Sequence, residues 1–276
     1  MSIFAYEKKD VILEVDKVCL TLGTNLILRD VSIQIQDIVR PGTTQGQIVG
    51  FLGPSGVGKT KLFEIMAGLL HPSSGTVRLG QPLEPVSVGR VGVVQQNYPL
   101  FQHRTVFGNL MVALERNPKV HATNRKSRAM DLLDKFGLAG KQGAYPAQLS
   151  GGQRQRVAIA QQLACSERFL LLDEPFSGLD PNMVDEVSRM LVEVANLDEL
   201  NTIIIVSHDI TSTASISDTL WVMGRDRDAN GGIVPGAYIK HVYDLIERDL
   251  CWHDNLRDNP HFLDLVLEVR DLFKGL

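Results

Sequence analysis

One segment of the chain has the residue types and the spacing that suit the binding of a triphosphate. It consists of Gly53, Pro54, Ser55, Gly56, Val57, Gly58, Lys59 and Thr60. Gly56 and Gly58 allow a tight backbone turn, so that successive N–H groups can face an anion without side chains in the way. Lys59 adds a mobile positive charge for the β- and γ-phosphates, and the Thr60 hydroxyl is a suitable Mg²⁺ ligand. We therefore interpret residues 53–60 as a P-loop.

The sequence on either side of this segment supports the interpretation. An apolar run over residues 48–52 predicts a buried strand, and helical spacing of apolar residues begins at Leu62. A strand, a glycine-rich turn and a helix thus follow one another in the order that a phosphate cradle needs. The alternative, a glycine-rich turn that binds nothing, is disfavoured by this context.

A second cluster precedes another stretch with helical spacing. It consists of Leu149, Ser150, Gly151, Gly152 and Gln153. Ser150 and Gln153 have the spacing of a capping box, so one interpretation is a well-capped helix start and nothing more. Two adjacent glycines, however, lower helix propensity and expose N–H groups at the positive end of a helix, where a γ-phosphate would bind.

Two carboxylates follow a fully apolar run at residues 169–172. An acid at the end of a buried strand is usually structural, but downstream of a P-loop Asp173 and Glu174 suit two separate roles. Asp173 can hold Mg²⁺ or its water, and Glu174 can polarise the attacking water. We therefore predict Asp173 as a metal ligand and Glu174 as the catalytic base.

Polar residues also end two other predicted strands. Gln96 ends the strand at residues 91–96, where its side chain can reach Mg²⁺ or the attacking water. His208 follows the buried strand at residues 203–206, where it can touch a γ-phosphate. Taken alone, the first is typical of a solvated loop and the second of a polar cap, and only the preceding motifs favour a functional interpretation.

The composition is that of an ordinary soluble globular protein. The chain has 276 residues, of which 44% are hydrophobic and 22% charged, enough for one large α/β domain with a small subdomain. A net charge of −4 gives no reason to expect nucleic acid as a partner. The longest apolar runs are strand-sized, far below the roughly 20 residues that cross a bilayer.

Other features of the sequence bear on the compartment. The first residues lack the basic and apolar regions of a secretory signal, so we expect a cytoplasmic location. Cys19, Cys165 and Cys251 are widely separated and show no C-x-x-C spacing. We therefore expect reduced thiols rather than disulfides or a metal site.

The remaining patterns outline the domain organisation. Apolar and polar residues alternate over 11–36, which predicts half-exposed antiparallel strands. Residues 36–46 are predicted to form a loop. Helical spacing over residues 105–148 predicts an all-helical insert. Near the C-terminus, Asn259 and Pro260 have the pattern of an N-cap and a first helical residue, ahead of an apolar stripe that we expect to pack on the core or on a sister subunit.

Taken together, these residues resemble the ATPase domain of ABC transporters across about residues 11–225. Six motifs of that family occur in order: Walker A (residues 53–60), the Q-loop (Gln96), the signature (149–153), Walker B (169–174), the D-loop (177–180) and the switch histidine (His208). The resemblance implies an α/β fold with a RecA-like P-loop NTPase core, an antiparallel β subdomain and an α-helical subdomain. It places the ATPase domain at residues 1–240, the helical subdomain at about 105–160 and a C-terminal helical extension at 241–276.

The resemblance also implies a mechanism and partners. Two copies, identical or different, pair head to tail, so that each ATP lies between the P-loop of one and residues 150–153 of the other. Glu174 acts as base, His208 and Lys59 stabilise the γ-phosphate charge, and Thr60, Gln96 and Asp173 hold Mg²⁺. Closure of the dimer drives separate transmembrane permease subunits. These subunits contact the chain near residues 97–104, on the inner face of the membrane. An importer, with a solute-binding protein as a further partner, is favoured because no membrane domain is fused to the chain.

Two positions depart from the family pattern, and two other functions stay open. Leu22 stands where the family usually has an aromatic residue that stacks on adenine. We therefore expect weaker binding of adenine unless Tyr6 or another residue substitutes. Lys61 replaces a common Ser or Thr; it can either bind the α-phosphate or lie exposed on the helix. The alternatives are a soluble ABC-type ATPase without a transport role and a regulatory nucleotide-binding module. The presence of Glu174 and His208 argues against the second.

Overall fold

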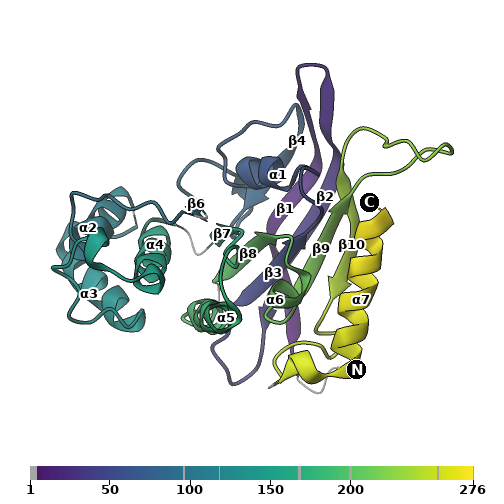
Figure 1. Cartoon of the computed structure of the whole chain (residues 1–276). Coiled ribbons are helices and arrows are strands. Elements are labelled where there is room, and N and C mark those ends of the chain that lie inside the picture. The colour runs from purple at the N-terminus through teal and green to yellow at the C-terminus, as the bar shows by residue number, and fades with distance from the viewer. Residues whose placement is uncertain are drawn as a thin grey trace.

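The apolar run before the P-loop forms a central strand of a six-stranded sheet in the computed structural model (Figure 1). The structure describes residues 5–95, 97–117, 119–166, 169–198, 201–253 and 255–275. The strand order is β10-β9-β3-β8-β7-β6, parallel throughout except for the edge pair β9 and β10. The strands are β3 (Gln47–Leu52), β6 (Val91–Val94), β7 (Phe169–Asp173), β8 (Thr202–Ser207), β9 (Thr219–Gly224) and β10 (Tyr238–Asp244).

A second sheet is antiparallel and lies against the first. Its order is β2-β1-β4-β5, formed by β1 (Glu7–Leu22), β2 (Asn25–Val39), β4 (Ser74–Leu79) and β5 (Glu84–Pro85). Helix α1 (Lys59–Met66) and the inner faces of both sheets share one apolar cluster, in which Phe51, Leu62 and Leu171 are almost completely buried. The P-loop connects β3 to α1, and both elements belong to this cluster. The cluster therefore fixes the P-loop between the two sheets.

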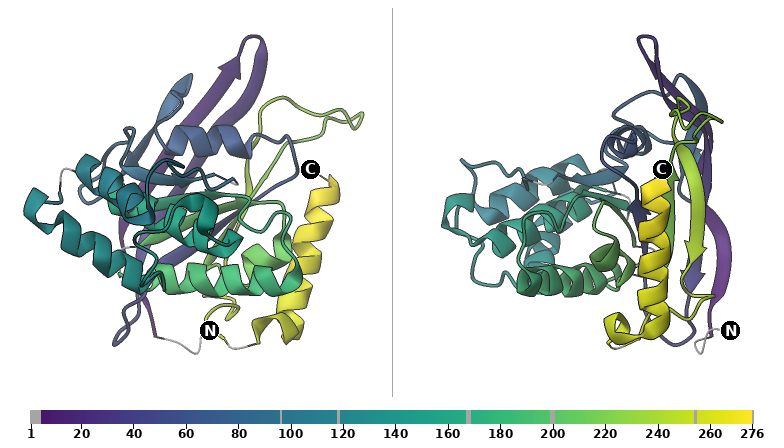
Figure 2. Two further views of the ribbon diagram at one scale, coloured as in Figure 1. Left: turned by 60° about the vertical axis from the view of Figure 1, so that its left-hand side comes forward. Right: turned by 45° about the vertical axis from the view of Figure 1, so that its right-hand side comes forward.

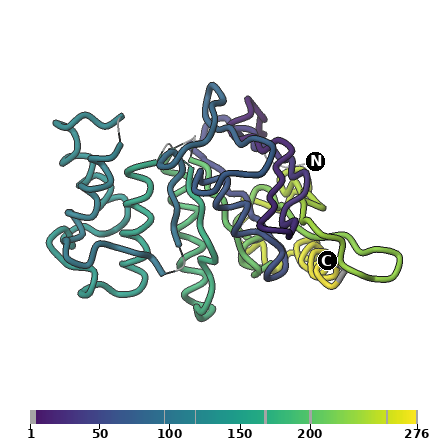
Figure 3. The backbone as a smooth tube through the Cα atoms, turned by 90° about the horizontal axis from the view of Figure 1, so that it is seen from above, coloured from purple at the N-terminus to yellow at the C-terminus, as the bar shows by residue number. Residues whose placement is uncertain are grey.

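Three helices form a separate lobe beside the sheets (Figures 1 and 3). They are α2 (Val106–Arg116), α3 (Arg125–Lys135) and α4 (Gly151–Cys165). Thr105 caps α2 by accepting a hydrogen bond from the Gly108 amide, and α3 is followed by Gly137, whose φ of 63° ends the helical path. The apolar faces of these helices join one cluster with α5 (Pro181–Ala195) and one face of the six-stranded sheet.

The last helix packs on one face of the same sheet, along its β9–β10 side (Figure 2). Helix α7 (Pro260–Gly275) begins where the Asn259 side chain accepts the His261 amide, as the sequence predicts. Its residues Phe262 and Val269 are fully buried against Leu220 and Val222 of β9, together with the short helix α6 (Ile210–Ala214). The apolar stripe of the tail therefore packs on the core of its own chain.

The structure confirms the α/β fold with its antiparallel and helical parts and corrects the bounds of one loop. Strand β2 continues to Val39, so only residues 40–46 form the loop that we expected from residue 36. The boundary that we expect at residue 240 lies within β10 and stays a prediction. No helix in the described part of the chain has the length and apolar character needed to cross a membrane.

Candidate active site

The P-loop forms the tight turn that its sequence predicts. Gly56 and Gly58 have φ angles of 74° and 120°, which residues with a side chain rarely adopt. A Cβ atom at Gly58 would lie 3.2 Å from the Leu28 side chain, so the loop also passes close to β2. The turn ends directly in α1, and this places the amides of the loop at the positive end of that helix.

The side chain of Lys59 is buried inside the loop that carries it. Its Nζ donates to the carbonyl oxygens of Gly53 at 2.7 Å and Pro54 at 3.2 Å. Burial lowers the pKa of this ammonium, and the nearby charges of Glu174 and Asp173 act in the opposite direction. The structure therefore brings Lys59 and the two carboxylates into one electrostatic environment, as the sequence predicts.

Asp173 and Glu174 lie where β7 ends beside the P-loop. Burial raises the pKa of Asp173, and the neighbouring Glu174 carboxylate adds to this effect. Glu174 itself has a φ of 49°, a left-handed conformation that is uncommon for a residue with a side chain. Its amide donates to Val206 on the adjacent strand at 2.8 Å. The hydrogen bond to β8 therefore holds the Glu174 backbone in this uncommon conformation.

Two groups from the end of β8 hold the Glu174 carboxylate. Its Oε2 accepts from the Ser207 hydroxyl at 2.9 Å, and its Oε1 lies 2.8 Å from Nδ1 of His208. His208 remains largely exposed, with 57% of its side chain accessible. The histidine can therefore reach both the glutamate and an approaching phosphate.

The oxygen groups near the loop fit a magnesium ion. Asp173 is half-buried at the end of its strand, and Thr60 is exposed on the first turn of α1. Mg²⁺ is commonly held by one or two protein oxygens, with phosphate and water as the other ligands. Gln96, the third predicted ligand, lies outside the described residues.

The predicted signature segment lies in the helical lobe, away from the P-loop (Figure 1). The capping box at the start of α4 forms: the Ser150 hydroxyl accepts the Gln153 amide, and the Gln153 side chain accepts the Ser150 amide. A Cβ atom at Gly151 or Gly152 would meet nothing within 4 Å. Nothing inside the described chain therefore explains why two poor helix formers occupy this turn.

The structure also places the residues that depart from the family pattern. Nζ of Lys61 bonds to Glu64 at 2.7 Å on the same helix face, and Leu22 is 41% exposed at the β1–β2 turn. Tyr6 packs edge-on against Trp252 at the opposite end of the sheet. Trp252 connects through Asp218 to Ile48 at the start of β3, which spans about 17 Å to the P-loop. Tyr6 therefore does not replace the missing aromatic residue.

Three residues near the site escape prediction from the sequence. Ser207 holds Glu174, Arg225 donates to the P-loop, and Tyr98 joins the two lobes. The Tyr98 hydroxyl donates to the Pro175 carbonyl at 3.3 Å and accepts from Gln155 of α4 at 2.8 Å. The one available signal was position, because Tyr98 follows Gln96 and Ser207 precedes His208.

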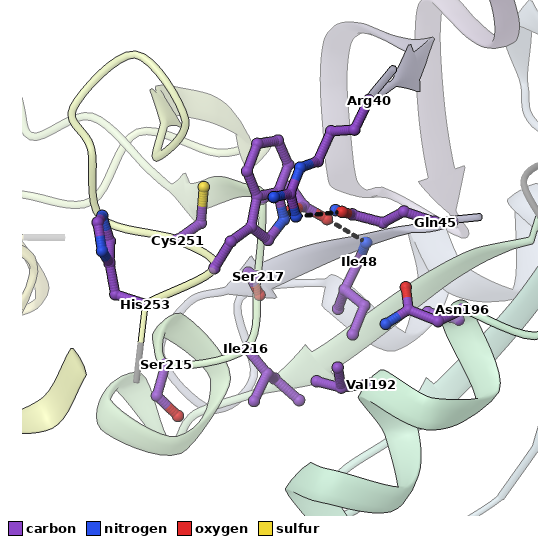
Figure 4. A pocket seen from close by; sticks show the side chains of 14 residues that line it. Arg40, Gln45, Ile48, Val192, Asn196, Ser215, Ile216, Ser217, Cys251 and His253 are labelled. Carbon is purple, nitrogen blue, oxygen red and sulfur yellow. Dashed lines mark hydrogen bonds between the residues drawn. The ribbon is translucent and has the colours of Figure 1, made fainter. Parts of the chain in front are cut away.

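A separate cavity of about 320 Å³ lies at the other end of β3 (Figure 4). Arg40 stacks over Trp252 there, and the buried Asp218 accepts hydrogen bonds from the Trp252 indole and the Ile48 amide. None of the residues that line this cavity was predicted as a site residue. It is therefore distinct from the P-loop site.

Comparisons with known proteins agree with this geometry. Residues 39–177, about half of the chain, match the family described as ABC transporter, and the chain belongs to this family. The sulfate/thiosulfate import ATP-binding protein CysA 2 of Rhizobium meliloti (strain 1021) is 39% identical over 249 residues, which cover 83% of this chain and 65% of that protein. CysA of Escherichia coli (strain K12) is 38% identical over 220 residues, 77% of this chain and 58% of that protein.

A solved structure is similar as well. CbiO1 from Clostridium perfringens, part of the ABC transporter complex CbiONQ, has a TM-score of 0.67 and 29% sequence identity, over 83% of this chain and 89% of that one. The chain spans about three fifths of the length of the curated relatives. The family predicted from the six motifs is thus confirmed.

Proposed function

We propose that this chain binds and hydrolyses ATP and thereby drives import through separate transmembrane subunits. The observation that carries this proposal is the convergence of Lys59, Glu174 and His208 at the ends of neighbouring strands. A regulatory module that only binds nucleotide has no need of a carboxylate and an imidazole held together beside the P-loop. The import ATP-binding proteins among the relatives support the direction of transport.

Each group has a role that its surroundings allow. The amides of residues 53–60 and Lys59 bind the phosphates, and Glu174 takes a proton from the attacking water. His208, linked to Glu174 and exposed, stabilises charge on the γ-phosphate together with Lys59. Asp173 and Thr60, with Gln96, hold Mg²⁺, which neutralises phosphate charge when bound. Lys61 contributes to the α-phosphate only if it leaves Glu64.

A second ATPase subunit completes each site in this proposal. The open turn presents the amides of Gly151 and Gly152 at a helix start, since those of Ser150 and Gln153 are bonded within the capping box. Placed over the P-loop of a partner, the same amides would bind its γ-phosphate. The unexplained glycines at this exposed position support such a close approach.

The remaining partners follow from the family. We propose transmembrane permease subunits that contact residues 97–104, a solute-binding protein outside the membrane, and a peripheral location on its inner face. CbiO1 is part of the ABC transporter complex CbiONQ, which supports a role of this chain in a larger transporter assembly.

Two measurements test the function. Purified chain should release phosphate from MgATP at a rate that rises more steeply than linearly with chain concentration, because pairs are active. Affinity purification from membranes should recover permease subunits together with the chain. A rate strictly proportional to chain concentration down to dilute solution would contradict the paired site, and a chain that never copurifies with membrane proteins would contradict the transport role.

A further inference from the structure

The residues after β9 run directly past the P-loop. A Cβ atom at Gly53 would lie 2.9 Å from the Met223 carbonyl oxygen, so the end of β9 and the start of the loop are in contact. Arg225 follows Met223 by two residues, directly after the end of β9. Its Nη2 donates to the carbonyl oxygens of Gly56 at 3.1 Å and Val57 at 3.3 Å.

These two hydrogen bonds act on the peptide groups that form the phosphate cradle. In a trans peptide the C=O and the following N–H point in opposite directions. Holding the Val57 carbonyl toward Arg225 therefore turns the next amide, that of Gly58, toward the other face of the loop. The bond to the Gly56 carbonyl holds the turn itself, in which the Val57 amide donates to the Pro54 carbonyl at 3.4 Å. A guanidinium is well suited to this task because its donors are fixed in one plane and its charge is permanent.

The segment that carries Arg225 is itself firmly held near its base. Asp226 accepts from Arg29 at 2.7 Å and from the Tyr238 hydroxyl at 2.9 Å, and Lys240 lies 3.3 Å away. Farther along, the Ala237 amide donates to Ile27, whose side chain would meet a Cβ atom at Gly58. Both ends of loop 225–237 are thus fixed against the P-loop or the strand beside it, while its tip projects away (Figure 3).

We propose that Arg225 is a positioning residue of the nucleotide site, which holds the P-loop amides in the orientation that binds the phosphates of ATP. The proposal rests on the ATP binding proposed above and adds a residue from outside the six motifs. Arg225 acts through the loop backbone and need not touch the nucleotide.

The test compares three variants of the full chain. Arg225→Ala removes both hydrogen bonds, and Arg225→Lys keeps the charge with a single flexible donor group. Arg227→Ala is the matched control, since Arg227 lies on the same loop and its Nη1 bonds to Gly231 within that loop. Binding is measured by displacement of a fluorescent ATP analogue with MgATP, and turnover by phosphate release.

We expect Arg225→Ala to weaken MgATP binding about tenfold or more, Arg225→Lys to be intermediate, and Arg227→Ala to match the wild type. Because the amides bind phosphate in the ground state as well as in the transition state, KM should rise while kcat at saturation is largely kept. A general loss of folding would instead lower the active fraction and hence kcat. If Arg225→Ala does not fold, Arg225→Lys carries the test.

Wild-type affinity in Arg225→Ala, or in Arg225→Lys where that variant carries the test, would overturn the proposal. So would an equal loss in Arg227→Ala. Failure of the wild-type chain to bind MgATP is a separate result, visible before any variant is made. It would overturn the proposed function and this inference with it.

Discussion

Nδ1 of His208 lies 2.8 Å from Oε1 of Glu174, although the two residues are 34 positions apart in the chain. Each follows a strand of the same parallel sheet, and the carboxyl ends of β7 and β8 bring them together. Ser207 donates to the other carboxylate oxygen. The base proposed for hydrolysis is thus oriented by residues of its own chain.

Replacing this base should separate binding from turnover. In Glu174→Gln the side chain keeps its size but cannot take up a proton, so we expect phosphate release to fall by about 10²–10⁴. MgATP binding should persist, and size-exclusion chromatography with MgATP should show a trapped dimer. Glu186→Gln, at an exposed glutamate paired with Arg156, serves as control. An unchanged rate in Glu174→Gln would rule out the assigned role.

Removing the loop ammonium should cause a large loss of nucleotide binding. Lys59→Ala deletes the buried charge that faces the triphosphate, and hydrogen bonds to charged groups contribute about 1.5–3 kcal/mol each. We expect MgATP affinity to fall by at least an order of magnitude in a fluorescence titration. Lys274→Ala, which removes an exposed lysine on α7 paired with Asp271, should bind like the wild type. Normal MgATP affinity in Lys59→Ala would refute the role of Lys59 in phosphate binding.

The signature turn can be tested against a matched helix cap. Ser150→Ala and Thr105→Ala each remove a side chain that accepts a backbone amide at a helix start in the same lobe. Both should lower the free energy of unfolding by about 1 kcal/mol, measured in urea. We expect only Ser150→Ala to weaken the ATP-dependent dimer, because the proposal places only its turn against the partner's phosphate. An equal effect of both variants on dimerisation would leave residues 150–153 a helix cap alone.

The bridge between the lobes should contribute to stability. Tyr98→Phe removes the hydroxyl that joins the Pro175 carbonyl to Gln155 and leaves buried polar groups without a partner. We expect a loss of about 1–2 kcal/mol in the free energy of unfolding. Tyr145→Phe, at an exposed tyrosine, should change it by no more than about 0.5 kcal/mol. Urea titration of both variants would show whether the bridge exists in solution.

The buried carboxyl below the cavity should make stability depend on pH. Burial raises the pKa of Asp218 from 3.8 to about 7, so the folded chain binds a proton that the unfolded chain has released. This contribution is complete below about pH 4 and is lost as the pH rises through about 7. Between pH 5 and 8 the wild type should therefore lose about 2–3 kcal/mol from this group.

The control variants isolate that carboxyl. Asp218→Asn cannot ionise and should lack this decline, although it loses one acceptor and starts from a lower stability. Asp271→Asn, at an exposed carboxylate of α7, should keep the decline. Chemical unfolding of each variant at pH 5 and pH 8 gives the comparison, and identical slopes for the wild type and Asp218→Asn would contradict the assignment.

The sequence predicts what depends on short-range pattern. The P-loop, the capping box at Ser150 and the apolar strand before Asp173 are all defined within a few residues, and the structure forms each of them. The chemistry of these motifs depends on a fixed spacing of residues, and that spacing is visible in the sequence.

The contacts that complete the site are long-range and leave no such pattern. Arg225 reaches the P-loop across 169 positions, and Tyr98 reaches Pro175 across 77. No motif surrounds Arg225, and the one signal for Tyr98 is its position two residues after Gln96. The sequence also predicts the end of β2 too early. Pairing with β1 extends this strand beyond the residues in which apolar and polar side chains clearly alternate.

The open turn at Gly151 and Gly152, set in a different lobe from Lys59, has a genetic consequence. Two chains that are each inactive, one altered at Lys59 and the other at the turn, should complement one another when they are mixed. In such a hybrid, one of the two composite chambers unites an intact cradle with an intact turn. A protein that kept its whole chamber within one polypeptide would show no such rescue.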